Sequence, residues 1–179
     1  MIDPTKITNF KRSRKELQEF LLFCIVAAGK NSFVQAKKLE EYLCGDMPFV
    51  RIIIDNKFGC LEWRLRNCGM GQYSRICRAF TELAESNLDL ASCTVADLEA
   101  IHGIGPKTAR FFILHTRPNQ QIAVLDTHIL KHMAAQGISV PKVTPSGKKY
   151  LELEQKFLSL VPPHMTVAEY DLNLWNSYA

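Results

Sequence analysis

No stretch of this 179-residue chain is apolar over the length that a membrane crossing requires. A spanning helix needs ~20 predominantly apolar residues, and the longest uninterrupted apolar run here covers only residues 20–28. Residues 2–15 lack the apolar core of a secretion signal, and we find no internal repeat or low-complexity segment. The sequence therefore predicts a protein without a membrane span that works inside the cell.

Neither sign of charge is in large excess. Lys and Arg number 22 against 18 Asp and Glu, which leaves a formal net charge of +4. This balance permits a nucleic-acid-binding face but is too small to demonstrate one. Hydrophobic residues make up 47% of the chain, which is enough for one compact core or for two small lobes.

Cysteine motifs are missing as well. No pair of the six cysteines forms Cys-x-x-Cys, none lies after Cys93, and the histidines show no metal-ligand spacing. We therefore predict reduced, mostly buried thiols and no metal site.

What the chain does contain is helical periodicity nearly throughout, with short connections. This pattern predicts an all-α fold. An apolar, strand-like stretch covers residues 122–125, and residues 137–146, with two prolines, indicate a loop. The expected helices cover residues 15–28, 31–43, 48 onward, 61–66, 73–86, up to 101, 107–115, 127–136, 147–161 and 167 onward.

Two glycines predict a tight turn between two of these helices. Gly103 and Gly105 end the helix that reaches residue 101, because glycine tolerates positive φ angles. Pro106 then occupies the first position of the next helix, where its missing N–H costs nothing. The free amides at such a helix start can bind a phosphate, although an ordinary helix–helix turn would look the same.

A lysine and an aspartate follow at helix starts. Lys107 lies just after the turn, and Asp126 comes 126 − 107 = 19 positions later, directly before a predicted helix. Separately, Lys107 could be a solvated surface residue and Asp126 a helix N-cap. Together they suit removal of a damaged base from DNA, because a carboxylate stabilises the positive charge that develops on the sugar and an amine can attack C1′ to form a Schiff base.

The residues around both positions resemble a known superfamily. Ile-His-Gly-Ile-Gly-Pro-Lys-Thr-Ala, residues 101–109, resembles the helix-hairpin-helix of the DNA glycosylases that include endonuclease III and 8-oxoguanine DNA glycosylase. Val-Leu-Asp-Thr-His-Ile, residues 124–129, resembles their catalytic aspartate segment. By this resemblance Lys107 is the nucleophile and Asp126 the catalytic carboxylate. A lysine at this position implies a bifunctional enzyme that also nicks the strand by β-elimination; His102 departs from the usual proline.

The resemblance implies an all-α, two-lobed helical bundle of the HhH-GPD type without an iron–sulfur cluster. Residues 30–128 would form the central lobe, and residues 1–29 with 129–179 the second. The cleft between the lobes would bind double-stranded DNA that carries a damaged base. The protein would act as a monomer at the nucleoid. The hairpin carbonyls could hold a monovalent cation. The residues expected at the DNA backbone are His102, Gly103, Ile104, Gly105, Thr108 and His128.

Two further segments resemble DNA-contacting turns of the family. The turn that begins at Gly69 resembles one whose side chain wedges into the duplex when a base is flipped, which implies Gln72, with Tyr73 beside it. Tyr73 could equally pack in the core, and Arg75 is expected to face phosphate. A loop over residues 29–31, formed by Gly29, Lys30 and Asn31, would lie opposite the expelled base, although Asn31 could equally be a helix N-cap.

The last helix narrows the resemblance to the compact second type of 8-oxoguanine glycosylase. Asp171 could accept a hydrogen bond from a purine N–H or could cap a helix, and Phe111 and Trp175 could stack on a base or belong to the core. These three residues form the expected base pocket. The compact enzymes end in a lysine, whereas this chain ends Asn-Ser-Tyr-Ala.

These features predict a bifunctional DNA glycosylase and abasic-site lyase that excises an oxidised purine, most simply 8-oxoguanine. One alternative keeps the chemistry but changes the base to another damaged, modified or mismatched one. A second alternative is a non-catalytic module that uses the hairpin only to grip DNA.

Overall fold

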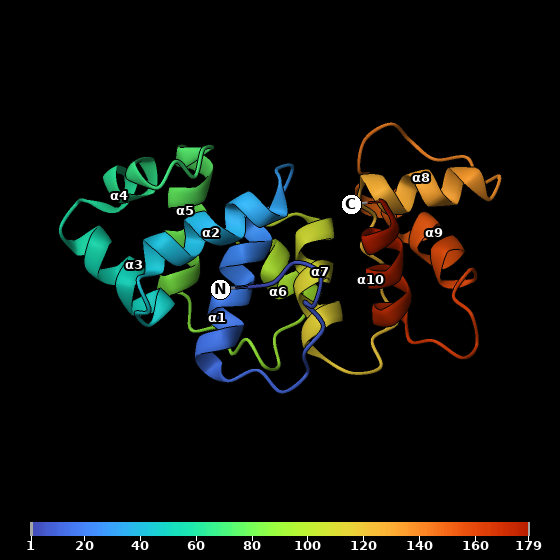
Figure 1. Ribbon diagram of the computed structural model, residues 1–179, viewed down its shortest axis with the longest axis horizontal. Helices are drawn as coiled ribbons and strands as arrows, with labels where there is room; N and C mark the ends of the chain where they lie inside the picture. The colour runs from blue at the N-terminus through green and yellow to red at the C-terminus, as the bar shows by residue number, and fades with distance from the viewer. Residues whose placement is uncertain (1, 179) are drawn as a thin grey trace. The chain divides into compact units, whose positions relative to one another are not determined.

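The computed structural model describes residues 2–178, and all the regular secondary structure in that range is helical, as predicted. Packing divides it into two compact units, each described here by itself (Figure 1). The first unit contains Lys11–Gly105 and the described residues before Thr5; the second contains Thr5–Phe10 and the residues from Pro106 on. Helices of the first unit are α1 (Arg14–Val26), α2 (Ser32–Leu43), α3 (Pro48–Lys57), α4 (Leu61–Asn67), α5 (Tyr73–Glu85) and α6 (Val95–Glu99). Those of the second are α7 (Pro106–Thr116), α8 (Thr127–Ala135), α9 (Gly147–Leu158) and α10 (Val167–Tyr178).

Each predicted helix is present, with ends that differ by a few residues. Local capping explains several of the starts. Ser13 caps α1 and exchanges hydrogen bonds with Glu16 in a capping box, and Asn31 accepts a hydrogen bond from the Val34 amide at the start of α2. Residues 122–125, which looked strand-like, form no strand.

Helix α1 supplies the centre of the first unit. Its residues from Phe20 to Val26 are all fully or almost fully buried, because α1 packs against α2, α3 and α5. Helix α5 contributes Ile76, Phe80 and Leu83 to this core, the face that its periodicity predicted. A helix apolar on nearly every face is stable only when it is covered on nearly every side.

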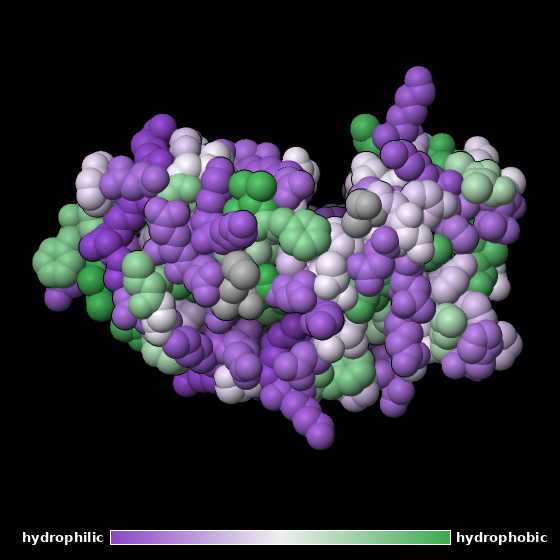
Figure 2. Space-filling view, in the orientation of Figure 1, coloured by the Kyte–Doolittle hydropathy of each residue, from purple (hydrophilic) through white to green (hydrophobic). Residues whose placement is uncertain are grey.

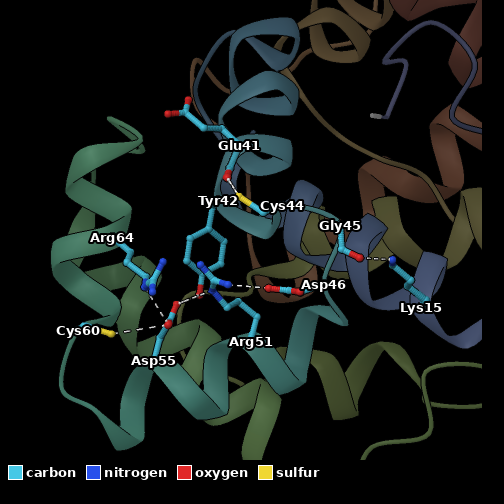
Figure 3. A network of polar contacts seen from close by, with 10 residues as sticks. All are labelled: Lys15, Glu41, Tyr42, Cys44, Gly45, Asp46, Arg51, Asp55, Cys60 and Arg64. Atoms are coloured by element: carbon cyan, nitrogen blue, oxygen red, sulfur yellow. Dashed lines mark hydrogen bonds and ion pairs between the residues drawn. The ribbon is translucent and has the colours of Figure 1, made fainter.

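A buried carboxylate ties α3 to α2 and α4 (Figure 3). Asp55 is 1% exposed and accepts hydrogen bonds from the Tyr42 hydroxyl at 3.1 Å and from Arg51 Nε at 3.2 Å through Oδ2. Its Oδ1 lies 3.0 Å from Arg64 Nε and accepts from Cys60 Sγ at 3.6 Å. Burial, and then the Asp55 charge, raise the pKa of Tyr42. Both carboxylate oxygens are therefore engaged by protein groups.

The surface of the first unit is less polar near α3 and α4, where hydrophobic colour gathers on the face drawn (Figure 2). Trp63 and Phe58 are the most exposed of its large hydrophobic side chains.

The prediction that the cysteines are mostly buried is wrong: all six are free thiols, but only Cys24 and Cys93 are buried and Cys44 is exposed. Helical periodicity places side chains on a face but does not say whether another helix covers that face.

The core of the second unit forms around α8, α9 and α10. Leu130, Met133, Leu153 and Phe157 are among its buried side chains. Two polar side chains of α9 point into this core and bind the chain segment before α8, as described below. Across residues 2–178 no helix combines the length and the hydropathy of a membrane span.

The boundary between the units falls in the hairpin, between Gly105 and Pro106. The predicted lobes, residues 30–128 and residues 1–29 with 129–179, divide the chain elsewhere. Helix α1 groups with the first unit because its apolar faces pack on α2, α3 and α5, and α7 groups with the second because it packs on α10. Of the N-terminal residues, only Thr5–Phe10 joins the C-terminal helices.

Candidate active site

Asp126 is the N-cap of α8. Its Oδ1 accepts hydrogen bonds from the amides of His128 and Ile129, both at 2.9 Å, as its sequence context predicted. These two bonds use one oxygen, so they orient the carboxylate while leaving Oδ2 outside the cap. The half-buried acid is thereby held rigidly at a helix start, where the helix dipole favours its negative charge.

The segment before Asp126 is held by side chains of α9 instead of a neighbouring strand. The Tyr150 hydroxyl donates to the Ala123 carbonyl at 2.7 Å and accepts from the Leu125 amide at 3.1 Å. Glu154 Oε1 accepts from the Ala123 amide at 2.8 Å and from Arg110 Nε at 2.8 Å. These buried bonds satisfy backbone groups that a sheet would otherwise satisfy, and they set the position from which Asp126 projects.

Lys107 lies in the first turn of α7. It is half-buried, and its Nζ is 5.5 Å from the centre of the Phe111 ring, one helical turn further on. Among residues 2–178 no carboxylate forms an ion pair with this amine within 4.0 Å. An amine without a tight ionic partner is available to react with a ligand, unlike Arg110, whose guanidinium is bound by Glu154.

Asp171 on α10 lies near both of these residues. It is 4% exposed, and its Oδ2 is 3.1 Å from His115 Nε2. Burial raises the pKa of Asp171, while the hydrogen bond from His115 opposes that shift; the charge of Asp126 raises it further and the charge of Lys107 lowers it. The predicted amine and the predicted acid therefore both act on one buried carboxylate. Asp171 Oδ1 is buried and accepts no hydrogen bond from the described residues.

Aromatic rings contact His115 and His128, the histidines next to this group. Phe111 contacts the His115 ring edge to face, with centroids 5.2 Å apart. His128, just after Asp126, has Trp175 at 6.4 Å and Tyr178 at 6.1 Å between ring centroids, and its Nδ1 is buried without a hydrogen-bond partner among the described residues. The expected pocket residues Phe111, Asp171 and Trp175 thus lie in the same unit as Lys107 and Asp126.

His115 is a site residue that the sequence analysis did not name, because His115 does not have metal-ligand spacing to the other histidines. It is fully buried, and its Nδ1 lies 2.8 Å from the Thr8 hydroxyl. The signal was present: His115 follows Phe111 by four residues and Lys107 by eight, which places all three on one face of a helix. Thr8 could not have been predicted from the sequence, since it lies 107 residues before His115 and only folding brings the two together.

The hairpin of the first unit is held by two side chains of α5. Glu82 Oε2 accepts from the His102 amide at 2.7 Å, and this bond, followed by one from Arg78, lowers the pKa of Glu82. Arg75 Nη1 donates to the Gly103 carbonyl at 3.1 Å. Gly103 has φ +79°, and a Cβ there would lie 3.0 Å from Arg75 Cγ, so this position requires glycine for its backbone angle and for space.

The other predicted hairpin contacts differ in exposure. Ile104 is buried, whereas Gly105 is exposed and His102 is half-buried. Thr108, in the first turn of α7, is 5% exposed. A contact between Thr108 and DNA would therefore use its backbone amide, which the first turn of a helix leaves unpaired.

The turn before α5 is held by cations. Lys30 Nζ donates to the Met70 carbonyl at 2.7 Å and to the Gly71 carbonyl at 3.3 Å, and Lys38 Nζ donates to the Gly69 carbonyl at 2.5 Å. The loop over residues 29–31 and the glycine turn therefore lie together, as the predicted wedge and opposite-base residues require. Gln72 at the tip has φ +50°, a left-handed conformation that costs a residue other than glycine about 1–2 kcal/mol.

The expectation that Arg75 faces phosphate is wrong. Its three nitrogens donate to Gln72 Oε1 at 2.9 Å, to the Gly103 carbonyl and to the Ile25 carbonyl at 2.9 Å. Burial lowers the pKa of Arg75. The guanidinium thus joins the glycine turn to the hairpin and to the end of α1. Tyr73 is half-buried and lies under the Arg66 guanidinium, 4.4 Å from the ring centre.

Comparison with known proteins agrees with this arrangement. Two crystal structures of the 8-oxoguanine glycosylase/lyase of Methanocaldococcus jannaschii share the fold at 23% sequence identity. One, in complex with a 15-mer DNA containing 8-oxoguanine, matches 97% of this chain and 86% of its own length with a TM-score of 0.64. The other matches 97% and 83% with a TM-score of 0.66. The model of the family described as 8-oxoguanine DNA glycosylase matches residues 3–163, so the chain belongs to that family.

Proposed function

We propose that this chain excises 8-oxoguanine from double-stranded DNA with Lys107 as nucleophile and Asp126 as the charge-stabilising carboxylate, and then nicks the strand. The observation that supports the proposal is that both groups lie near the buried Asp171. The charge of Asp126 raises the pKa of Asp171, and the charge of Lys107 lowers it. Backbone phosphate binding alone needs no such amine and carboxylate. The family assignment also favours the enzyme over a non-catalytic DNA-binding module.

The reaction begins at the sugar of a flipped nucleotide. Unprotonated Lys107 Nζ attacks C1′ while the N-glycosidic bond breaks, and the base leaves with the bonding electron pair and takes up a proton. The Asp126 carboxylate stabilises the positive charge that develops on the sugar. Opening of the sugar ring then leaves an imine between Nζ and C1′.

Strand cleavage follows from that imine. Loss of a proton from C2′ breaks the C3′–O bond, which releases the 3′ side of the strand as a 5′-phosphate end. Water then hydrolyses the imine and returns Lys107 as a free amine. Each step after base departure concerns the sugar alone, so it requires Lys107 but no base pocket.

The base pocket is formed by Phe111, Asp171 and Trp175. The Asp171 oxygen that accepts no protein hydrogen bond suits an N–H of the base, and the two aromatic rings suit stacking on it. A buried acceptor of this kind discriminates strongly against a base that offers no donor to it, because the acceptor is then left unpaired.

The duplex is held by the hairpin and by the turn before α5. The hairpin amides and His128 would bind phosphate, and Gln72 would fill the gap left by the flipped base, with the Gly29–Asn31 loop opposite. A monovalent cation at the hairpin would use carbonyls other than that of Gly103, which already accepts from Arg75. The expected place of action is the nucleoid.

Borohydride trapping tests the nucleophile. Reduction of the imine should link the protein covalently to a duplex with one 8-oxoguanine, and Lys107→Gln should abolish that link. Lys131→Gln, at an exposed lysine of the same unit, is the matched control and should trap like the wild type. Efficient trapping of the Lys107→Gln protein would remove Lys107 from the mechanism.

A lesion panel tests the substrate. Duplexes with single lesions, each opposite all four bases, are assayed with and without alkali, since scission without alkali reports the lyase step. We expect 8-oxoguanine to be cleaved fastest. The alternative of another damaged, modified or mismatched base motivates the other lesions, and faster excision of one of them would reassign the base.

A further inference from the structure

A row of three polar groups crosses the second unit from the N-terminal segment to the pocket. The Thr8 hydroxyl lies 2.8 Å from His115 Nδ1, and His115 Nε2 lies 3.1 Å from Asp171 Oδ2. The backbone adds to it, because the His115 carbonyl accepts from the Asn9 amide at 3.1 Å. His115 is fully buried and Asp171 is 4% exposed, so the whole row depends on its internal partners.

With Asp171 ionised, the direction of this row is fixed, because a carboxylate oxygen can only accept a hydrogen bond. A neutral His115 with its proton on Nε2 donates to Asp171 Oδ2 and accepts at Nδ1 from the Thr8 hydroxyl; a charged His115 donates at both nitrogens. In both forms Nε2–H donates to the carboxylate. His115 therefore holds Asp171 as an acceptor through one oxygen and leaves the other oxygen, Oδ1, for a donor outside the protein.

The free oxygen belongs to a carboxylate that lies near the two candidate catalytic residues. Asp171 is close enough to Lys107 and Asp126 to respond to both charges, and Tyr150 of α9 responds to Asp171 in turn. Phe111, which is next to the Lys107 amine, contacts the edge of the His115 ring. A buried, unpartnered acceptor costs free energy unless a ligand donor meets it, which is the usual mark of a binding group rather than a packing group.

We infer that His115 is a positioning residue for lesion recognition: braced by Thr8, it orients the Asp171 carboxylate so that Oδ1 accepts an N–H of the flipped oxidised purine. This inference rests on the proposed function and deepens it. The bases it selects carry an N–H donor on the edge that faces Asp171, and a base presenting a lone pair there is repelled by the carboxylate.

The consequence is specific to one half of the reaction. Excision requires the base to be seated, whereas cleavage at a preformed abasic site has no base to seat and uses only the sugar chemistry of Lys107. Loss of the His115 ring nitrogens should therefore impair excision more than abasic-site cleavage. A residue needed only for folding would impair both to the same degree.

The test compares two single-turnover rates for each protein, on a duplex with one 8-oxoguanine opposite cytosine and on the same duplex with an abasic site. His115→Phe keeps the ring volume and removes both nitrogens. We expect the ratio of excision to abasic-site cleavage to fall by about ten-fold to a hundred-fold, the effect of losing a hydrogen bond to a charged group. Thr8→Val should lower the ratio in the same direction by less.

The matched control is His132→Phe. His132 on α8 also bonds to α10 through its ring, with Nε2 2.9 Å from the Tyr170 hydroxyl, but it makes no bond to Asp171, so this variant should keep the wild-type ratio. In a double-mutant cycle His115→Phe should have no further effect on the ratio once Asp171→Asn is present.

The outcomes separate the two hypotheses. A wild-type ratio in His115→Phe, a parallel loss of both rates, or full additivity with Asp171→Asn overturns the role of His115 while the proposed chemistry stands. A wild-type protein that cleaves neither duplex overturns the proposed function itself.

Discussion

Two buried aspartates show how differently a carboxylate can be used in one protein. Asp55 in the first unit has four polar partners on its two oxygens. Asp171 in the second unit has His115 on one oxygen and, among residues 2–178, no hydrogen-bond partner on the other. Burial of a carboxylate is costly in both places, but only at Asp171 is the compensation incomplete. That difference, and not burial alone, makes Asp171 the candidate for binding a ligand and Asp55 a structural acid.

Replacing the structural acid should destabilise the protein strongly. Asp55→Asn leaves the Arg51 and Arg64 guanidiniums without their buried counter-charge, so we expect the free energy of unfolding to fall by about 3 kcal/mol or more. Urea denaturation measures this change. Glu62→Gln, in the exposed pair with Arg66, is the control and should cost no more than about 1 kcal/mol; similar costs for the two variants would show that Asp55 is not important for stability.

At the scale of elements, the approach to Asp126 is the least regular and the most constrained segment of the second unit. Residues 122–125 form neither a helix nor a strand, and side chains of Tyr150 and Glu154 bind the backbone groups that a strand ladder would bind. This apolar run between two helices is therefore a fixed arm that ends at the candidate catalytic carboxylate of Asp126. The binary pattern of the run could not distinguish a strand from this arrangement.

Tyr150→Phe tests the arm. The change removes the donor to Ala123 and the acceptor for Leu125 in a buried place, so we expect a loss of about 1–3 kcal/mol in the free energy of unfolding. We also expect slower excision, because base departure needs Asp126 in place, and less change in abasic-site cleavage. Thermal unfolding and the two cleavage assays measure these effects. Unchanged rates in a destabilised variant would mean that the helix cap alone positions Asp126.

At the scale of the molecule, the hairpin, which we propose binds DNA, is also where the chain passes from one unit to the other. Glu82 and Arg75, both on α5, hold the hairpin. Glu82 accepts from the His102 amide, and Arg75 donates to the Gly103 carbonyl. Lys107 follows within the next few residues, at the start of the second unit. The attachment of the hairpin to α5 therefore fixes the end of the first unit, directly before Lys107.

The Glu82 contact should weaken in acid. Because the pKa of Glu82 in the folded protein is below its ordinary 4.5, its stabilising contribution is fully present above pH 4.5 and is lost as the pH falls through the lower folded value. In a nuclear magnetic resonance titration the His102 amide should shift with a midpoint below 4.5. Glu82→Gln should abolish that titration, whereas a midpoint above 4.5 in the wild type would contradict the assignment.

The sequence by itself determined the helices, the glycine hairpin and the two candidate catalytic residues, because periodicity, caps and turn residues are local properties that neighbouring positions encode. It also placed Asp171 and Phe111 among the pocket candidates. Only the tertiary structure decided that Arg75 binds protein carbonyls, that α9 side chains hold the arm before Asp126, and that Thr8 reaches His115. Each of these depends on contacts between residues far apart in the chain, and no local pattern records which distant partner satisfies a buried polar group.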